Sequence, residues 1–93
     1  MKTFYIEKST DTLNGPKVII GAATNNKYET YGVRIIKSES LRNSISDKND
    51  GVEEFDTEAE LLARLEPFIF MTENAKTIHN FLNDRREYLK GKA

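Results

Sequence analysis

The hydrophobic pattern of the chain changes its period between Gly51 and Glu60. Before this junction apolar residues tend to recur at every second position, as in a strand, and after it they recur about every 3.6 residues, as in a helix. Residues 55–60 read Phe-Asp-Thr-Glu-Ala-Glu, in which Thr57 and Glu60 have the spacing of a helix-opening capping box. The pattern therefore predicts strands first and helices afterwards.

Three strands are predicted in the first part of the chain, over residues 3–7, 17–23 and 28–37. In the first, Phe4 and Ile6 share one face. The second is a β-branched run that is apolar on both faces, which is typical of a central strand. The third alternates, and we assign Val33 and Ile35 to its core face.

Short turns predict that these strands form an antiparallel meander. Asn14 and Gly15 suit the first turn, and two Asn within residues 24–27 suit a two-residue hairpin. Gly21 and Gly32 stand inside predicted strands, where glycine marks a β-bulge or a close packing contact.

The segment 38–50 is rich in serine and carries only Leu41 and Ile45 as apolar anchors. Two interpretations stay open. It forms a fourth, edge strand that pairs with 52–55 through the Asp-Gly turn at 50–51, or it is a loop.

Two helices are predicted after the junction. Thr57 caps the first, which ends near Glu66 because Pro67 disfavours helix at the preceding residue. The second starts near Thr72 and carries an apolar stripe that contains Arg85. The predicted core consists of Val18, Ile20, Val33 and Ile35 packed against Leu61, Leu65, Ile78 and Leu82.

These elements predict an α+β fold, in which an antiparallel sheet of three or four strands is followed by two C-terminal helices packed on one face. With 93 residues, the whole chain 1–93 is expected to form a single domain.

The composition of the chain excludes some classes of function and disfavours others. The chain has no cysteine, a formal net charge of −1, a pI of about 5.8 and a mean hydropathy of −0.62. Disulfides and thiolate metal sites are therefore excluded, and phosphate binding driven by net charge is disfavoured. No apolar run approaches the length of a membrane span, so we expect a cytoplasmic protein that does not bind membranes.

Catalytic and ligand-binding signatures are missing from the sequence. His79 is the only histidine, and the glycines form no phosphate-binding cluster. The segment 47–51 fails as a calcium loop because Lys48 stands where a ligand oxygen is needed. We therefore expect no catalytic residue, no cofactor and no metal, and hence a protein that is not an enzyme.

Charged residues form an acidic run in 53–60 and a basic tip near the C-terminus. Complementarity to the helix dipoles accounts for both, but uneven charge also steers partners. The candidate partner-binding residues are Glu53, Glu54, Asp56, Glu58, Arg85 and Arg86. The alternative is a nucleic-acid-binding face on the open side of the sheet, formed by Tyr5, Lys17, Tyr28 and Arg34.

Three short strands followed by the helix-opening segment 54–61, Glu-Phe-Asp-Thr-Glu-Ala-Glu-Leu, resemble several small phage-encoded α+β proteins, including some anti-CRISPR inhibitors. The same helix entry is similar to that of integrase arm-binding domains, although this chain adds a second helix and lacks their basic sheet. No functional residue carries over. The resemblance implies a small cytoplasmic inhibitor or accessory factor that occupies a surface of a larger protein or nucleoprotein complex.

Overall fold

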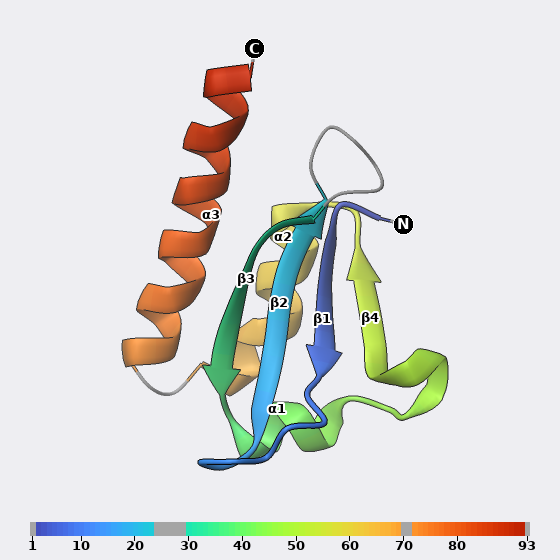
Figure 1. Ribbon diagram of the computed structural model, residues 1–93. Helices are drawn as coiled ribbons and strands as arrows, with labels where there is room; N and C mark the ends of the chain where they lie inside the picture. Colours follow the sequence, from blue (N-terminus) through green and yellow to red (C-terminus); the bar gives the residue numbers. More distant parts are fainter. Residues whose placement is uncertain (1, 24–29, 70–71, 93) are drawn as a thin grey trace.

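The computed structural model describes residues 2–23, 30–69 and 72–92. It shows an antiparallel sheet of four strands with helices packed on one of its faces, which confirms the predicted α+β fold (Figure 1). The elements in chain order are β1 (Phe4–Lys8), β2 (Lys17–Ala23), β3 (Thr30–Lys37), α1 (Glu39–Ser44), the 3₁₀ turn η1 (Lys48–Gly51), β4 (Val52–Phe55), α2 (Glu58–Leu65), the 3₁₀ turn η2 (Glu66–Phe68) and α3 (Thr72–Lys92).

The sheet has the strand order β3-β2-β1-β4, with every neighbouring pair antiparallel. The first three strands form the predicted meander. The turn before β2 uses positive φ at Asn14 and Gly15, as expected, whereas the predicted hairpin at 24–27 lies outside the described residues. A fourth strand exists, and it pairs with β1 instead of with residues 38–50.

Neither interpretation of residues 38–50 was right, because residues 39–44 form the short helix α1. The Ser38 hydroxyl accepts a hydrogen bond from the Leu41 amide at 3.2 Å and caps this helix. Leu41 and Ile45, four residues apart, are both buried in the core. A serine cap followed by this apolar pair was the sequence signal for a helix.

Thr57 caps α2 as predicted. Its hydroxyl accepts a hydrogen bond from the Glu60 amide at 3.1 Å, and the Glu60 carboxylate accepts one from the Asp56 amide at 3.2 Å. The helix ends at Leu65, and Pro67 lies in the 3₁₀ turn that follows. The capping box therefore fixes where the helical part of the chain begins.

Most of the predicted core is correct, but two of its strand residues are not. Val18, Ile20, Leu61, Leu65, Ile78 and Leu82 are all buried. Val33 and Ile35 are instead 50% and 52% exposed, and the buried residue of β3 is Ile36. Arg34 and Ile36 lie opposite Ile20 and Val18 in the strand pairing, so they share the helix-covered face.

A β-bulge in β3 explains why the predicted core face of this strand was wrong. Gly21 pairs with Val33 and Ala22 pairs with Tyr31, so that Gly32 is an extra residue in β3, with a φ of +50°. The extra residue shifts the alternation of inward and outward side chains by one position. Residues before and after Gly32 therefore do not follow one continuous period of two, and a prediction that assumes such a period assigns part of the strand to the wrong face.

The helices leave one face of the sheet without a covering element in the described part of the chain. Figure 1 views the molecule from this side, with α2 behind the sheet and α3 running alongside β3. We refer to this side as the open face.

Candidate functional site

The open face is built by strand alternation, because every second side chain of a strand points to the same side. The strand pairing places these side chains on it: Tyr5 and Glu7 from β1, Lys17 and Ile19 from β2, Val33, Ile35 and Lys37 from β3, and Val52 and Glu54 from β4. Lys17 and Lys37 pair with each other at one end of the face. Gly21 belongs to the same face and contributes only backbone.

Two rows of paired residues cross this face and give it two unlike halves. One row runs Ile35, Ile19, Glu7, Val52, and the other runs Val33, Gly21, Tyr5, Glu54. The half over β2 and β3 is therefore aliphatic. The half over β1 and β4 carries two carboxylates beside Tyr5 and Val52.

Two large exposed apolar side chains, Val33 and Ile35, are neighbours on the aliphatic half. Among the described residues, the other one of this kind is Leu13, which is 72% exposed. Leu13 lies in the turn before β2, where its carbonyl accepts a hydrogen bond from the Lys17 ammonium. Single exposed apolar residues are ordinary on a protein surface, but neighbouring ones mark an interaction surface.

Tyr5 lies flat against the middle of the face. A Cβ atom placed on Gly21 would come within 2.5 Å of the Tyr5 ring Cζ and hydroxyl oxygen, so the ring occupies the space above this glycine. Burial raises the pKa of Tyr5, and the nearby Glu7 carboxylate adds to the effect. The close contact explains why a glycine stands inside a central strand, as its position in the sequence indicated.

The two acidic residues of β4 have different surroundings. Glu53 points to the helix side, where the Arg64 guanidinium binds it with N–O distances of 2.8 and 2.9 Å. These hydrogen bonds raise the pKa of Arg64. Glu54 points to the open face, and within the described part of the chain neither Glu54 nor Glu7 forms an ion pair.

Two of the other four candidate partner-binding residues contact each other, and a third contacts a lysine. Glu58 and Arg86 form an ion pair that joins α2 to α3, with the Arg86 Nε 3.2 Å from a Glu58 oxygen, and this contact raises the pKa of Arg86. Asp56 lies 3.9 Å from the Lys2 ammonium. The acidic run and the basic tip are therefore joined by one ion pair, Glu58 with Arg86.

Arg85, the cation within the apolar stripe of α3, stacks on an aromatic ring. Its guanidinium lies 4.8 Å from the centroid of the Phe4 ring, and its Nε is buried without a hydrogen-bond partner. Arg85 therefore takes part in the contact between α3 and the sheet.

The structure does not assemble the predicted nucleic-acid face. Arg34, predicted on the open face, lies on the helix side, 3.2 Å from the Asp84 carboxylate and 5.9 Å from the centroid of the Phe81 ring. Lys17 lies at one end of the open face but contacts the turn before β2, 3.5 Å from the Asp11 carboxylate. Tyr28 lies outside the described residues. The open face consequently carries no continuous basic stripe among the described residues.

Asp11 is also fixed by its own turn. Its carboxylate accepts a hydrogen bond from the Leu13 amide at 2.8 Å, and this bond, together with Lys17, lowers the pKa of Asp11. The turn therefore holds the Lys17 ammonium away from the centre of the open face.

The outer edge of β3 is flanked by α3 (Figure 1). The Asn74 side-chain amide donates to the Lys37 carbonyl at 3.0 Å, and the Arg34 guanidinium donates to the Val33 carbonyl at 3.3 Å. Helix cover and side-chain hydrogen bonds of this kind oppose the addition of another strand. The face of the sheet is therefore accessible to a partner, whereas the β3 edge is not.

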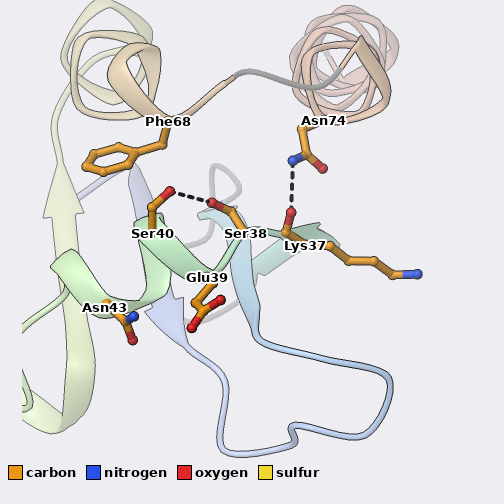
Figure 2. A pocket seen from close by; sticks show the side chains of 7 residues that line it. All are labelled: Lys37, Ser38, Glu39, Ser40, Asn43, Phe68 and Asn74. Carbon is orange, nitrogen blue, oxygen red and sulfur yellow. Dashed lines mark hydrogen bonds between the residues drawn. The ribbon is translucent and has the colours of Figure 1, made fainter.

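A cavity of about 500 Å³ lies between α1, η2 and the start of α3 (Figure 2). Its lining residues are Lys37, Ser38, Glu39, Ser40, Asn43, Phe68 and Asn74. Ser38 caps α1 and lies 3.3 Å from the Ser40 hydroxyl, while Asn74 bonds the Lys37 carbonyl. These polar groups bond within the chain and join the ends of three elements, so we assign the cavity a structural role.

Comparisons with known proteins give no relative: no protein-family model, no curated protein and no solved structure matches the chain. Across residues 2–23, 30–69 and 72–92, no helix is long and apolar enough to cross a membrane. In the same residues no group of three or more His, Cys, Asp or Glu side chains is arranged to hold a metal ion.

Proposed function

We propose that this protein is a non-catalytic binding protein, an inhibitor or accessory factor that occupies a surface of a larger protein or nucleoprotein complex. The open face makes the contact. The supporting observation is that Val33 and Ile35, each about half exposed, lie beside Ile19 and Tyr5 on a sheet face that no described element covers. A protein interface likewise combines apolar residues with polar ones beside them.

The charges of this face favour a protein partner over a nucleic acid. Its carboxylates, Glu7 and Glu54, repel phosphates, and its two lysines, Lys17 and Lys37, stand at one end and form no stripe along the face. Nucleic-acid binding draws its affinity from clustered Lys and Arg. Of the described residues of the alternative, a nucleic-acid-binding face, Tyr5 lies at the centre of the open face as a stacking platform and Lys17 lies at one end, whereas Arg34 lies on the helix side.

The resemblance of residues 54–61 to small phage-encoded inhibitors of the anti-CRISPR type is consistent with this proposal. Among the charged candidates, Glu54 is the one that lies on the open face. Glu53, Glu58 and Arg86 already form internal ion pairs, which a partner would have to break or share.

Affinity capture from extracts of the native cell tests the proposal. The wild-type protein is compared with the double variant Val33→Thr/Ile35→Thr, which keeps β-branched residues but makes the aliphatic half polar. The control is Ala59→Ser/Ala63→Ser, which makes two exposed positions of α2 polar. We expect a partner that the wild type and the control retain and that the Val33/Ile35 variant loses.

Two results would contradict the proposal. Equal capture of the same partner by all three proteins would place the interface elsewhere. Tight binding of naked single-stranded oligonucleotides that weakens steeply as salt rises would favour the nucleic-acid alternative.

A further inference from the structure

We infer that the occupant of the open face is an amphipathic helix with one basic flank, contributed by the partner protein. This inference rests on the proposed function and adds the chemistry of the partner.

The aliphatic half is wide enough to hold one helix, and we call it the helix seat. Neighbouring strands lie about 4.8 Å apart, so β2 and β3 together support a helix about 10 Å across. Val33 and Ile35 are two positions apart on one strand, roughly 6.6 Å, and residues four apart on a helix are separated by about 6 Å along its axis. An apolar helical stripe lying along β3 therefore meets both side chains, with Ile19 beside them.

The acidic half lies along one side of that seat. Glu7 and Glu54 stand diagonally across the β1–β4 pair, about two to three strand spacings, or 10–15 Å, from β3. Long Lys or Arg side chains on one flank of a helix seated over β2 and β3 span much of this distance.

Charge complementarity determines the charge of the helix flank that faces β1 and β4. Within the described residues, Glu7 and Glu54 have no ion-pair partner, whereas Glu53 on the opposite face of β4 is bound by Arg64. The two lysines of the same face, Lys17 and Lys37, pair with each other at the far end of β2 and β3, where Lys17 is held beside Asp11. They therefore lie away from the two carboxylates over β1 and β4. A basic flank of the partner thus supplies the missing countercharge over β1 and β4.

An extended peptide is the less suitable occupant of the aliphatic half, because the other sheet edge, β4, lies beside the acidic half. Strand addition needs an accessible edge, and the β3 edge beside the aliphatic half is flanked by α3, with its Lys37 and Val33 carbonyls bonded to Asn74 and Arg34. The side chains of the face stay accessible to a helix that lies on top of them.

Two synthetic helical peptides of about 18 residues are suitable probes, because this length supports helix formation. Both carry leucines at helical spacing. One has lysines along one flank, and the other has glutamates at the same positions. Binding to the full chain is followed by fluorescence anisotropy and by amide chemical shifts. We expect the lysine peptide to bind about three- to tenfold more tightly, with shifts concentrated in β1, β2 and β3.

Charge reversal gives the decisive comparison. Glu7→Lys/Glu54→Lys should invert the preference so that the glutamate peptide binds more tightly, and the milder Glu7→Gln/Glu54→Gln should abolish the preference. The control Glu39→Lys/Glu66→Lys reverses two exposed acids on α1 and η2 and should leave the preference for the lysine peptide unchanged.

The results distinguish a failure of the basic flank from a failure of the proposed surface. Equal affinity for the two peptides, with shifts on the open face, would overturn the basic flank and leave the proposed surface intact. Shifts confined to α2 and α3, together with unchanged capture by Val33→Thr/Ile35→Thr, would overturn the surface itself. A dimer in sedimentation that Val33→Thr/Ile35→Thr dissociates would replace the helix with a second copy of this chain.

Discussion

Tyr5 and Gly21 depend on each other at the scale of single residues. The tyrosine ring fills the space above the glycine, and this burial keeps its pKa above the ordinary value. Gly21→Ala puts a methyl group where the ring lies and must move the ring outward. We therefore expect the pKa of Tyr5 to fall towards the ordinary value in Gly21→Ala, measured by NMR titration of labelled tyrosine.

The control for that titration is Tyr5→Phe, which identifies the Tyr5 signal among the other tyrosines. A Tyr5 pKa that stays raised in Gly21→Ala would show that the ring is buried by contacts other than the one with Gly21.

The same raised pKa predicts how stability depends on pH. Because the folded state favours the neutral phenol, its contribution to stability is complete below the pKa of the unfolded chain, about 10, and is lost as the pH rises through the folded pKa. The free energy of unfolding should therefore fall above about pH 10, and it should fall less in Tyr5→Phe. Identical pH profiles for the two proteins, measured by urea unfolding, would rule out this linkage.

At the scale of elements, α2 depends on its cap. The Thr57 hydroxyl accepts a hydrogen bond from the Glu60 amide, one of the first-turn amides that have no acceptor within the helix. Thr57→Ala should lower the free energy of unfolding by about 1 kcal/mol, whereas Thr57→Ser should keep most of the stability. The measurement is urea unfolding of the three proteins, and equal midpoints would contradict the capping role.

The orientation of β3 gives a sharper contrast between two neighbouring isoleucines. Ile36 is buried, so Ile36→Ala should lower the free energy of unfolding by about 2–5 kcal/mol. Ile35 is half exposed, and Ile35→Ala should lower it by at most about 1 kcal/mol. A larger loss for Ile35 than for Ile36 would mean that the strand faces the helices with its other side.

The elements that the sequence predicted well are those with local signals. The capping box at Thr57 and the β-branched run of β2 need no knowledge of the rest of the chain. The helix α1 was missed because its six residues carry one apolar pair within a serine-rich segment. The face of β3 was missed because Val33 and Ile35 are as apolar as Ile36, and only the bulge at Gly32 and the strand pairing choose between them.

At the scale of the whole molecule, the two faces of the sheet differ in how their charges are balanced. On the helix side, ion pairs join β4 to α2, α2 to α3, and β3 to α3. On the open face, Glu7 and Glu54 stand beside exposed aliphatic residues, and Lys17 and Lys37 lie at the end of β2 and β3. The sequence could not predict this surface, because its composition depends on which side of β3 the helices cover and on β4 pairing with β1, far apart in the chain.

The open face should contact the captured protein partner, and methyl NMR of their complex measures this contact. Cross-saturation from the partner to isoleucine and valine methyls reports which side chains it contacts. We predict strong attenuation of the Ile19, Val33 and Ile35 signals, with the buried Val18 and Ile36 as internal controls. Unattenuated Val33 and Ile35 signals in a saturated complex would contradict the account.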